Sequence, residues 1–120
     1  MADISNTAPE VYYMTSGEVR YCTVNMVNRM NDQTAVLTGT PTAAQARSIP
    51  SDATALTIAS VDKSAGALTI SGTSVAANGA IVFTITAGQD GGNYWILCTG
   101  VSTATVAETV KCHILVKVRD

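Results

Sequence analysis

Residues that could carry acid–base or nucleophilic chemistry are few in this chain of 120 amino acids. The single histidine, His113, falls inside an alternating stretch, and no Ser or Cys near it sits in the sharp turn that an activated nucleophile requires. Glu10, Glu18 and Glu108 lack the paired context of a glycosidase. The sequence therefore predicts that the protein is not an enzyme.

The pattern of possible metal and cofactor ligands is equally sparse. The six aspartates stand singly, and the chain has neither a Cys-x-x-Cys motif nor a pair of histidines. Residues 88–92 (Gly-Gln-Asp-Gly-Gly) offer one carboxylate where a calcium loop needs several, and no Lys or helical pattern follows them to bind phosphate. We interpret this segment as a turn and expect no metal and no cofactor.

The cysteines Cys22, Cys98 and Cys112 are odd in number and show no motif spacing. This pattern is typical of reduced thiols that fill small apolar spaces. If Cys98 and Cys112 are neighbours on adjacent strands, an oxidised pair is conceivable, but a reducing cytosol disfavours it.

The elements that must position these residues are predicted to be strands. Val, Ile and Thr supply 38 of the 120 residues, a composition that favours strands over helices. Short apolar runs separated by Gly- and Pro-containing turns predict a β-sandwich, rather than a small barrel, of about seven antiparallel strands. The expected strands are 18–27, 34–38, 56–61, 67–70, 80–86, 93–101 and 110–119. Residues 42–48, rich in Ala and Gln, are expected to form one helical turn.

The most informative pattern is the predicted hairpin of the last two strands. One face of its second strand carries five apolar residues: Val110, Cys112, Ile114, Val116 and Val118. A single register matches the apolar residues of both strands: Tyr94 with Val116, Ile96 with Ile114, and Cys98 with Cys112. Because strand side chains alternate, a slip by one residue would turn this set away from the core.

The opposite face of the last strand carries Lys111, Lys117 and Arg119. Such charges commonly protect a sheet edge, so we interpret this face as a solvated edge. The net charge of −2 gives no electrostatic footprint for nucleic acid. No segment approaches the roughly 20 apolar residues of a membrane helix.

Trp95 falls on the outward face by the same alternation. It is either covered by another segment of the chain, an anchor in a protein interface, or a platform for a sugar ring. The sequence alone leaves these three interpretations open.

An extended N-terminal arm is predicted over residues 1–14, ahead of a single domain over residues 15–120. Residues 1–9 are mostly small and polar. Residues 11–14 (Val-Tyr-Tyr-Met) are either a short edge strand on the domain's own core or an anchor into a partner, since Tyr and Met are enriched at interfaces. The candidate interface residues are Ile4, Val11, Tyr12, Tyr13, Met14 and Trp95.

Residues 56–119 resemble the small immunoglobulin-like proteins encoded among the structural genes of tailed phages, of the head-decoration or fibre–tail adaptor type. The similarity lies in the alternating strand 82–85 (Val-Phe-Thr-Ile), in the segment 87–98 (Ala-Gly-Gln-Asp-Gly-Gly-Asn-Tyr-Trp-Ile-Leu-Cys) and in the final strand ending Val-Lys-Val-Arg. The turn at 102–107 lacks the glycine expected from that family, and the N-terminal half is not covered.

The resemblance implies an immunoglobulin-like β-sandwich that serves as a non-enzymatic virion protein. It would bind and stabilise a capsid or tail through edge strands, the N-terminal arm and apolar patches. Its partners would be major capsid or tail proteins, and it would form a homo-oligomer without nucleic acid or membrane. Assembly would take place in the bacterial host's cytoplasm, which agrees with the absence of a signal-peptide pattern.

Two alternatives come from other classes of protein. A carbohydrate- or surface-binding β-sandwich module would need several exposed aromatic residues, whereas aromatic residues make up 5% of the chain. The second alternative is an immunoglobulin-like accessory domain of a bacterial assembly unrelated to phages.

Overall fold

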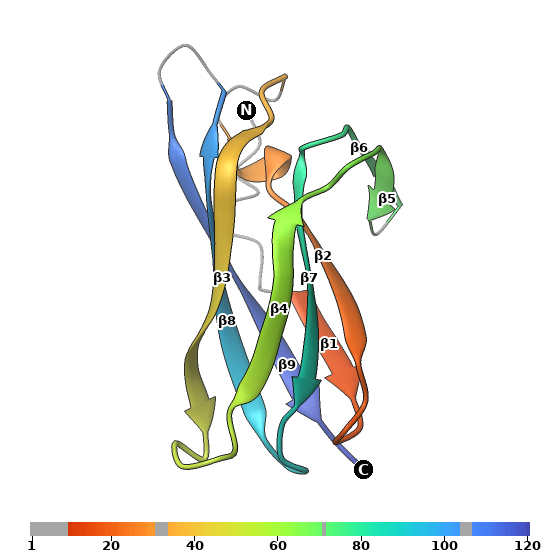
Figure 1. Cartoon of the computed structure of the whole chain (residues 1–120), viewed down its shortest axis with the longest axis vertical. Helices are drawn as coiled ribbons and strands as arrows, with labels where there is room; N and C mark the ends of the chain where they lie inside the picture. The colour runs from red at the N-terminus through yellow and green to blue at the C-terminus, as the bar shows by residue number, and fades with distance from the viewer. Residues whose placement is uncertain (1–9, 31–33, 71, 104–106) are drawn as a thin grey trace.

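The computed structural model describes residues 10–30, 34–70, 72–103 and 107–120, which form a β-sandwich (Figure 1). A four-stranded sheet in the order β1-β9-β8-β3 packs on a three-stranded sheet in the order β2-β7-β4, and β5 pairs with β6 in a small ribbon. The strands are β1 (Glu10–Met14), β2 (Arg20–Asn25), β3 (Leu37–Ile49), β4 (Leu56–Lys63), β5 (Leu68–Ile70), β6 (Thr73–Val75), β7 (Ala80–Ala87), β8 (Asn93–Ser102) and β9 (Thr109–Val118). One 3-10 turn, η2 (Val27–Arg29), follows β2. The all-β prediction is confirmed.

The order of the strands follows the immunoglobulin pattern. The β3-β8-β9 order corresponds to strands C, F and G of that fold, and the β2-β7-β4 order corresponds to strands B, E and D. Seven strands thus build the two main sheets, and the β5–β6 ribbon is additional. The pairing of β1 with β9 is parallel, which departs from the all-antiparallel expectation.

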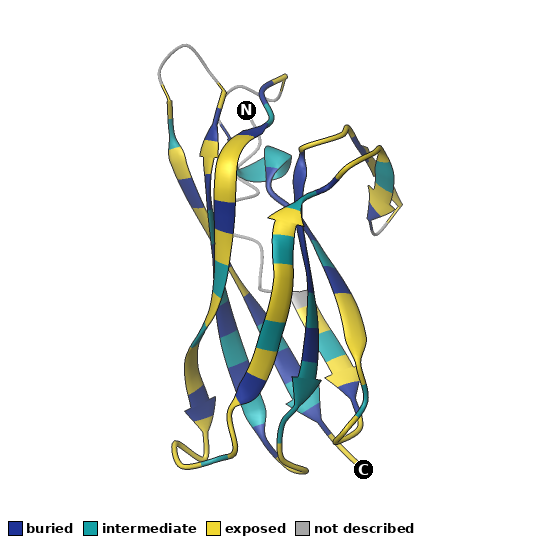
Figure 2. Cartoon of the chain, in the orientation of Figure 1, coloured by how far each residue is buried: buried dark blue, intermediate teal, exposed yellow. Residues whose placement is uncertain are grey.

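The core fills the space between the two sheets, as the alternating buried bands of Figure 2 show. Ile81, Phe83 and Ile85, the predicted core face of β7, are completely buried. On β8, Tyr94 and Ile96 are completely buried as well. Each large apolar side chain removed from water contributes about 1.5–3 kcal/mol to the stability of the fold, so this inward alternation holds the sheets together.

The β8–β9 hairpin has the predicted register. Tyr94 lies opposite Val116, Ile96 opposite Ile114, and Cys98 opposite Cys112. The five apolar residues of the predicted inward face of β9 are all buried: Val110, Cys112, Ile114, Val116 and Val118. This part of the prediction is confirmed in detail.

The helical turn predicted over residues 42–48 is wrong. These residues belong to β3, which runs for 13 residues from Leu37 to Ile49 and pairs with β8. The helix propensity of Ala and Gln amounts to tenths of a kcal/mol per residue, whereas the edge of β8 supplies backbone hydrogen bonds and core contacts. Two register shifts, between Thr38 and Thr42 and between Gln45 and Arg47, let β3 continue past Pro41.

Part of the predicted arm is a strand of the domain. Residues 10–14 form β1, and Met14, which is 4% exposed, packs in the core. The backbone N–H of Arg119 donates to the carbonyl of Met14 at 2.9 Å. The edge-strand interpretation of residues 11–14 is therefore the observed one, and residues 1–9 lie outside the described residues.

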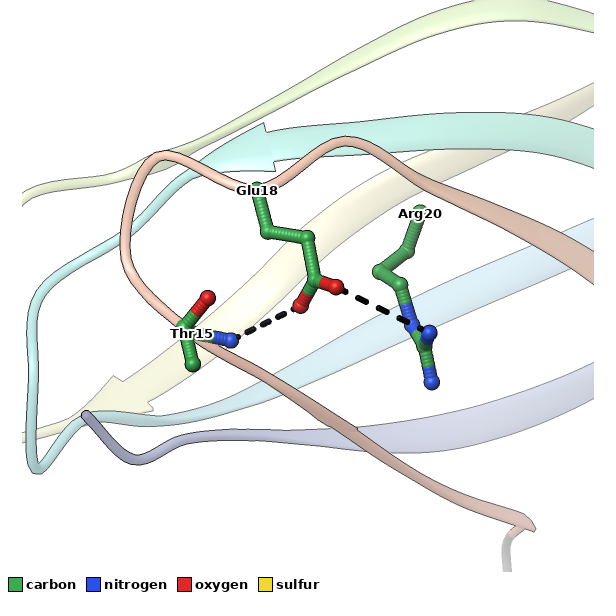
Figure 3. Close-up of polar contacts among 3 residues, drawn as sticks. All are labelled: Thr15, Glu18 and Arg20. Atoms are coloured by element: carbon green, nitrogen blue, oxygen red, sulfur yellow. Dashed lines mark hydrogen bonds and ion pairs between the residues drawn. The ribbon is translucent and has the colours of Figure 1, made fainter.

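The turn between β1 and β2 is held by short polar contacts. The Glu18 carboxylate accepts a hydrogen bond from the backbone N–H of Thr15 at 2.9 Å and lies 3.8 Å from Arg20 (Figure 3). The backbone N–H and the hydroxyl of Ser16 both donate to the Asp120 carboxylate at 2.7 Å. These contacts tie the turn to the end of β9.

The hydroxyl of Tyr94 joins three segments at one end of the sandwich. It accepts a hydrogen bond from the backbone N–H of Gln89 at 2.8 Å and donates one to the carbonyl of Thr54 at 2.6 Å. The turn at residues 88–92 that carries Gln89 has φ of +90° at Gly88 and +84° at Gly91, a conformation that glycine adopts without strain. The turn interpretation of this segment is confirmed.

Replacing Tyr94 with Phe is expected to lower the free energy of unfolding by about 1–3 kcal/mol, because the N–H of Gln89 and the carbonyl of Thr54 lose their partner. Urea unfolding monitored by circular dichroism measures the change. Tyr21→Phe is the matched control, because the side chain of Tyr21 is 60% exposed. An equal effect of both substitutions would contradict this role of the hydroxyl.

The pKa of the Asp120 carboxyl is lowered by the hydrogen bond from the Ser16 hydroxyl and by that from the Ser16 backbone. Since the folded-state pKa lies below that of the unfolded chain, the stabilisation is present above the ordinary pKa and is lost as the pH falls through the lowered one. In Ser16→Ala, we expect the pKa of Asp120 to rise toward its ordinary value in an NMR titration. An unchanged pKa would show that the hydroxyl does not stabilise the carboxylate.

Candidate functional site: a cationic sheet face

Apolar, aromatic and basic side chains lie close together on the outward side of the four-stranded sheet. Alternation and register place its members in neighbouring rows across β1, β9, β8 and β3. We call this surface the cationic face; its members are Val11, Tyr13, Arg47, Trp95, Leu97, Lys111, His113, Leu115 and Lys117.

An apolar row crosses the middle of the cationic face. Val11 lies beside Leu115, which lies opposite Trp95. Val11 is 45% exposed, whereas Leu115 and Trp95 are half-buried. Tyr13 stands one row away, is 58% exposed and has the ammonium of Lys117 at 6.0 Å from its ring centre. Aromatic and apolar groups are thus aligned in register on this face, and Val11 and Tyr13 are the more exposed of them.

Arg47 covers Trp95. The two residues are directly opposite on β3 and β8, and the guanidinium carbon lies 4.1 Å from the centre of the indole ring. Of the three interpretations of Trp95, coverage by another segment is observed in part, since a side chain of β3 occupies one face of its ring. A sugar platform needs an open ring face, so this stacking disfavours that interpretation.

The charges on the cationic face have one sign. Arg47, Lys111 and Lys117 are cations, His113 lies among them, and none of the members of the face is acidic. The interpretation of Lys117 as protection of a sheet edge is wrong, because β1 pairs with β9 at this position. Lys111 lies on β9 ahead of the residues that pair with β1. Where β9 is paired on both sides it has no open edge to protect, so the charge of Lys117 needs another explanation.

The structure separates the predicted interface residues. Val11, Tyr13 and Trp95 lie on the cationic face, whereas Tyr12 and Met14 point toward the interior. Met14 is 4% exposed and cannot reach a partner from its place in the core. Ile4 lies outside the described residues.

Tyr12 is half-buried and joins the two sheets. Its hydroxyl donates to the carbonyl of Thr23 at 2.7 Å and accepts from the N–H of the same residue at 3.2 Å. β2 is an edge strand, and this hydroxyl occupies both backbone groups of Thr23 on it.

A hollow lies beside η2, between β2 and the β5–β6 ribbon. Its lining includes Asn25, Val27, Asn28 and Thr73, and the buried Oδ1 atom of Asn28 has no hydrogen-bond partner among the described residues. The lining carries no acidic or basic side chain.

The cysteines are thiols, and all three are buried. Cys98 and Cys112 are cross-strand neighbours, as expected. Within the described ranges no group of three His, Cys, Asp or Glu side chains could hold a metal ion. The same ranges contain no helix that is long and apolar enough to cross a membrane.

Comparison with known proteins finds no matching family model, no matching curated protein and no matching solved structure. What the chain binds must therefore be inferred from the chemistry of its own surface.

Sequence reasoning found Trp95 but missed Arg47. The composition of residues 42–48 favours a helical turn, and a helical turn has no register with β8. The cation–π contact becomes visible only with the register shift at Ala46, which sets Arg47 opposite Trp95.

The Tyr12 contact leads to a prediction about the edge of β2. In Tyr12→Phe, the N–H and carbonyl of Thr23 lose their partner, so the free energy of unfolding should fall by about 1 kcal/mol. Hydrogen exchange at the Thr23 amide should accelerate more than exchange within β8. Unchanged exchange at Thr23 would show that the hydroxyl does not protect this edge.

Proposed function

We propose that this protein is a non-enzymatic structural protein of a tailed-phage virion, which binds the capsid or tail through its cationic face. The sequence resemblance of residues 56–119 suggests the setting, and the composition of the cationic face supports protein binding. The protein would act as a head-decoration protein or a fibre–tail adaptor, with a major capsid or tail protein as its partner.

The observation that carries the proposal is the row Val11–Leu115–Trp95 with Arg47 at its end. Trp, Tyr and Arg are the residues most enriched among those that dominate interface energetics. Lys111 and Lys117 stand away from this row on β9, where a polar rim would surround the buried centre. A rigid sheet presents these groups with little loss of conformational entropy on binding.

Assembly in many symmetric copies would make a modest contact sufficient. A molecule of 43 × 26 × 26 Å can bury only part of one side against a neighbour. In a shell, each copy is held by several such contacts, and multivalency raises the overall stability far above that of a single contact. The proposal therefore requires weak pairwise binding and strong retention in the particle.

The alternative, a carbohydrate- or surface-binding module, has less support. Trp95 is the only tryptophan, and one face of its ring is occupied by Arg47. A sugar would have to displace this guanidinium before it could stack. Tyr13 and Tyr21 are exposed, but they lie on different sheets and do not form one platform.

The proposal is tested on virions purified by density gradient from a host that carries the gene. Quantitative mass spectrometry is expected to find the protein at a fixed ratio to the major capsid or a tail protein. The ratio should persist after a wash in high salt, because the centre of the interface is apolar. Its absence from the purified particles would overturn the proposal.

A variant of the apolar row localises the contact. Leu115→Glu places a carboxylate in the row and is expected to reduce incorporation into particles at least about tenfold, equivalent to a loss of roughly 1.4 kcal/mol. Thr57→Glu, at an exposed position of β4 on the other sheet, is the matched control and should incorporate normally. Thermal unfolding verifies that both variants fold. Equal incorporation of the two would rule out the cationic face as the contact.

A further inference from the structure

A small hollow on the cationic face is lined by Ala46, Arg47, Trp95 and His113 and has a volume of about 280 Å³. Arg47 and Trp95 form its wall on one side, and His113 belongs to the next row, where it lies opposite Leu97. The hollow therefore combines a cation, an aromatic ring and an imidazole over three neighbouring strands, β3, β8 and β9.

The guanidinium of Arg47 is held in place but has open hydrogen-bonding capacity. Its central carbon lies 4.1 Å from the centre of the Trp95 ring, and a guanidinium has five N–H donors along its edges. Within the described residues, no carboxylate forms an ion pair with Arg47.

Two other arginines, Arg20 and Arg119, differ from Arg47 because their side chains have partners within the fold. Arg20 has the Glu18 carboxylate at 3.8 Å. Arg119 donates to the carbonyls of Gly92 and Val118 and to the side chain of Asn93. Both are engaged within the fold, whereas Arg47 lines the hollow and has no ion pair with a described carboxylate.

From this arrangement we infer that the hollow binds a carboxylate of the partner protein, supplied by an acidic side chain next to an apolar residue. The inference rests on the proposed function and names the chemistry of that partner. A planar carboxylate matches the fork of a guanidinium with two parallel hydrogen bonds. The apolar neighbour of the acid lies on the row of Trp95 and Leu115.

Charge complementarity favours an acidic protein over a nucleic acid. The cationic face has three Lys or Arg side chains and no acid, but the whole chain carries a net charge of −2. A long phosphate backbone would extend beyond this face and be repelled by the net negative charge of the protein. A short acidic segment would contact only the positive charges of the face itself.

The test uses the full-length protein and the fluorescence of its single tryptophan, which lies in the site. The probes are the peptide acetyl-Leu-Glu-Leu-Glu-amide and its counterpart with Gln in place of Glu. We expect a saturable change in emission with the acidic peptide and a Kd at least about tenfold lower than for the Gln peptide at low salt. Equal affinity for the two peptides, or no binding of either, would overturn the inference.

Substitutions assign the effect to Arg47. Arg47→Gln should weaken binding of the acidic peptide about tenfold or more, and Arg47→Lys should lie between that variant and the original protein, because Lys keeps the charge but loses the planar fork. Lys63→Gln removes one positive charge from β4 on the other sheet and should leave the Kd unchanged. Since Arg47 contacts the reporter ring, calorimetry repeats the measurement without fluorescence.

The outcomes distinguish this inference from the proposed function. If Arg47→Gln folds and incorporates into particles as well as the original protein, the carboxylate site is wrong while the virion proposal stands. If the acidic peptide binds through Arg47 but the protein is absent from particles, the site stands and the virion proposal fails. If inorganic phosphate displaces the acidic peptide at a similar concentration, the hollow is a phosphate site and the inference of a carboxylate ligand is wrong.

Discussion

Because side chains alternate along a strand, the pairing of Tyr94 with Val116 and of Cys98 with Cys112 determines which residues face the core and which form the outer surface. A shift of the β8–β9 hairpin by one residue would place Trp95 and His113 between the sheets and expose Ile96 and Ile114. The burial of the apolar set therefore also builds the cationic face. The same register aligns Leu115 with Trp95, so the binding surface is a by-product of the constraint that makes the core.

The parts of this fold that could be predicted are those in which one face of a strand is buried. The hairpin and β7 have alternating patterns that only one register satisfies, and their inward residues were identified correctly. Residues 42–48 could not be assigned in the same way, because β3 is an edge strand with mostly small or polar side chains. Its local preference for a helix is weak, and the pairing with β8 decides its conformation.

Only the part of the candidate site that lies on the β8–β9 hairpin could be predicted from the sequence. Alternation within the hairpin placed Trp95, His113 and the lysines on one side without knowledge of the fold. Arg47 comes from a strand whose register shifts at Ala46, and such a shift leaves no clear signal in the sequence. A contact between side chains of two strands depends on both registers, so an error in one strand hides the pair even when the other is correct.

The edges of the two main sheets bear on how a partner can bind. The edge of β2 is occupied at Thr23 by the Tyr12 hydroxyl. The edge of β3 contains Pro41 and two register shifts, and that of β4 has a shift after Ala59. Bulges, proline and occupied backbone groups all oppose the addition of a further strand, so these three edges are poor docking sites. At these three edges, binding through an added strand is thus less favourable than binding through the face. That face offers a continuous apolar row with an arginine stacked at its end, and a partner there needs no free backbone groups.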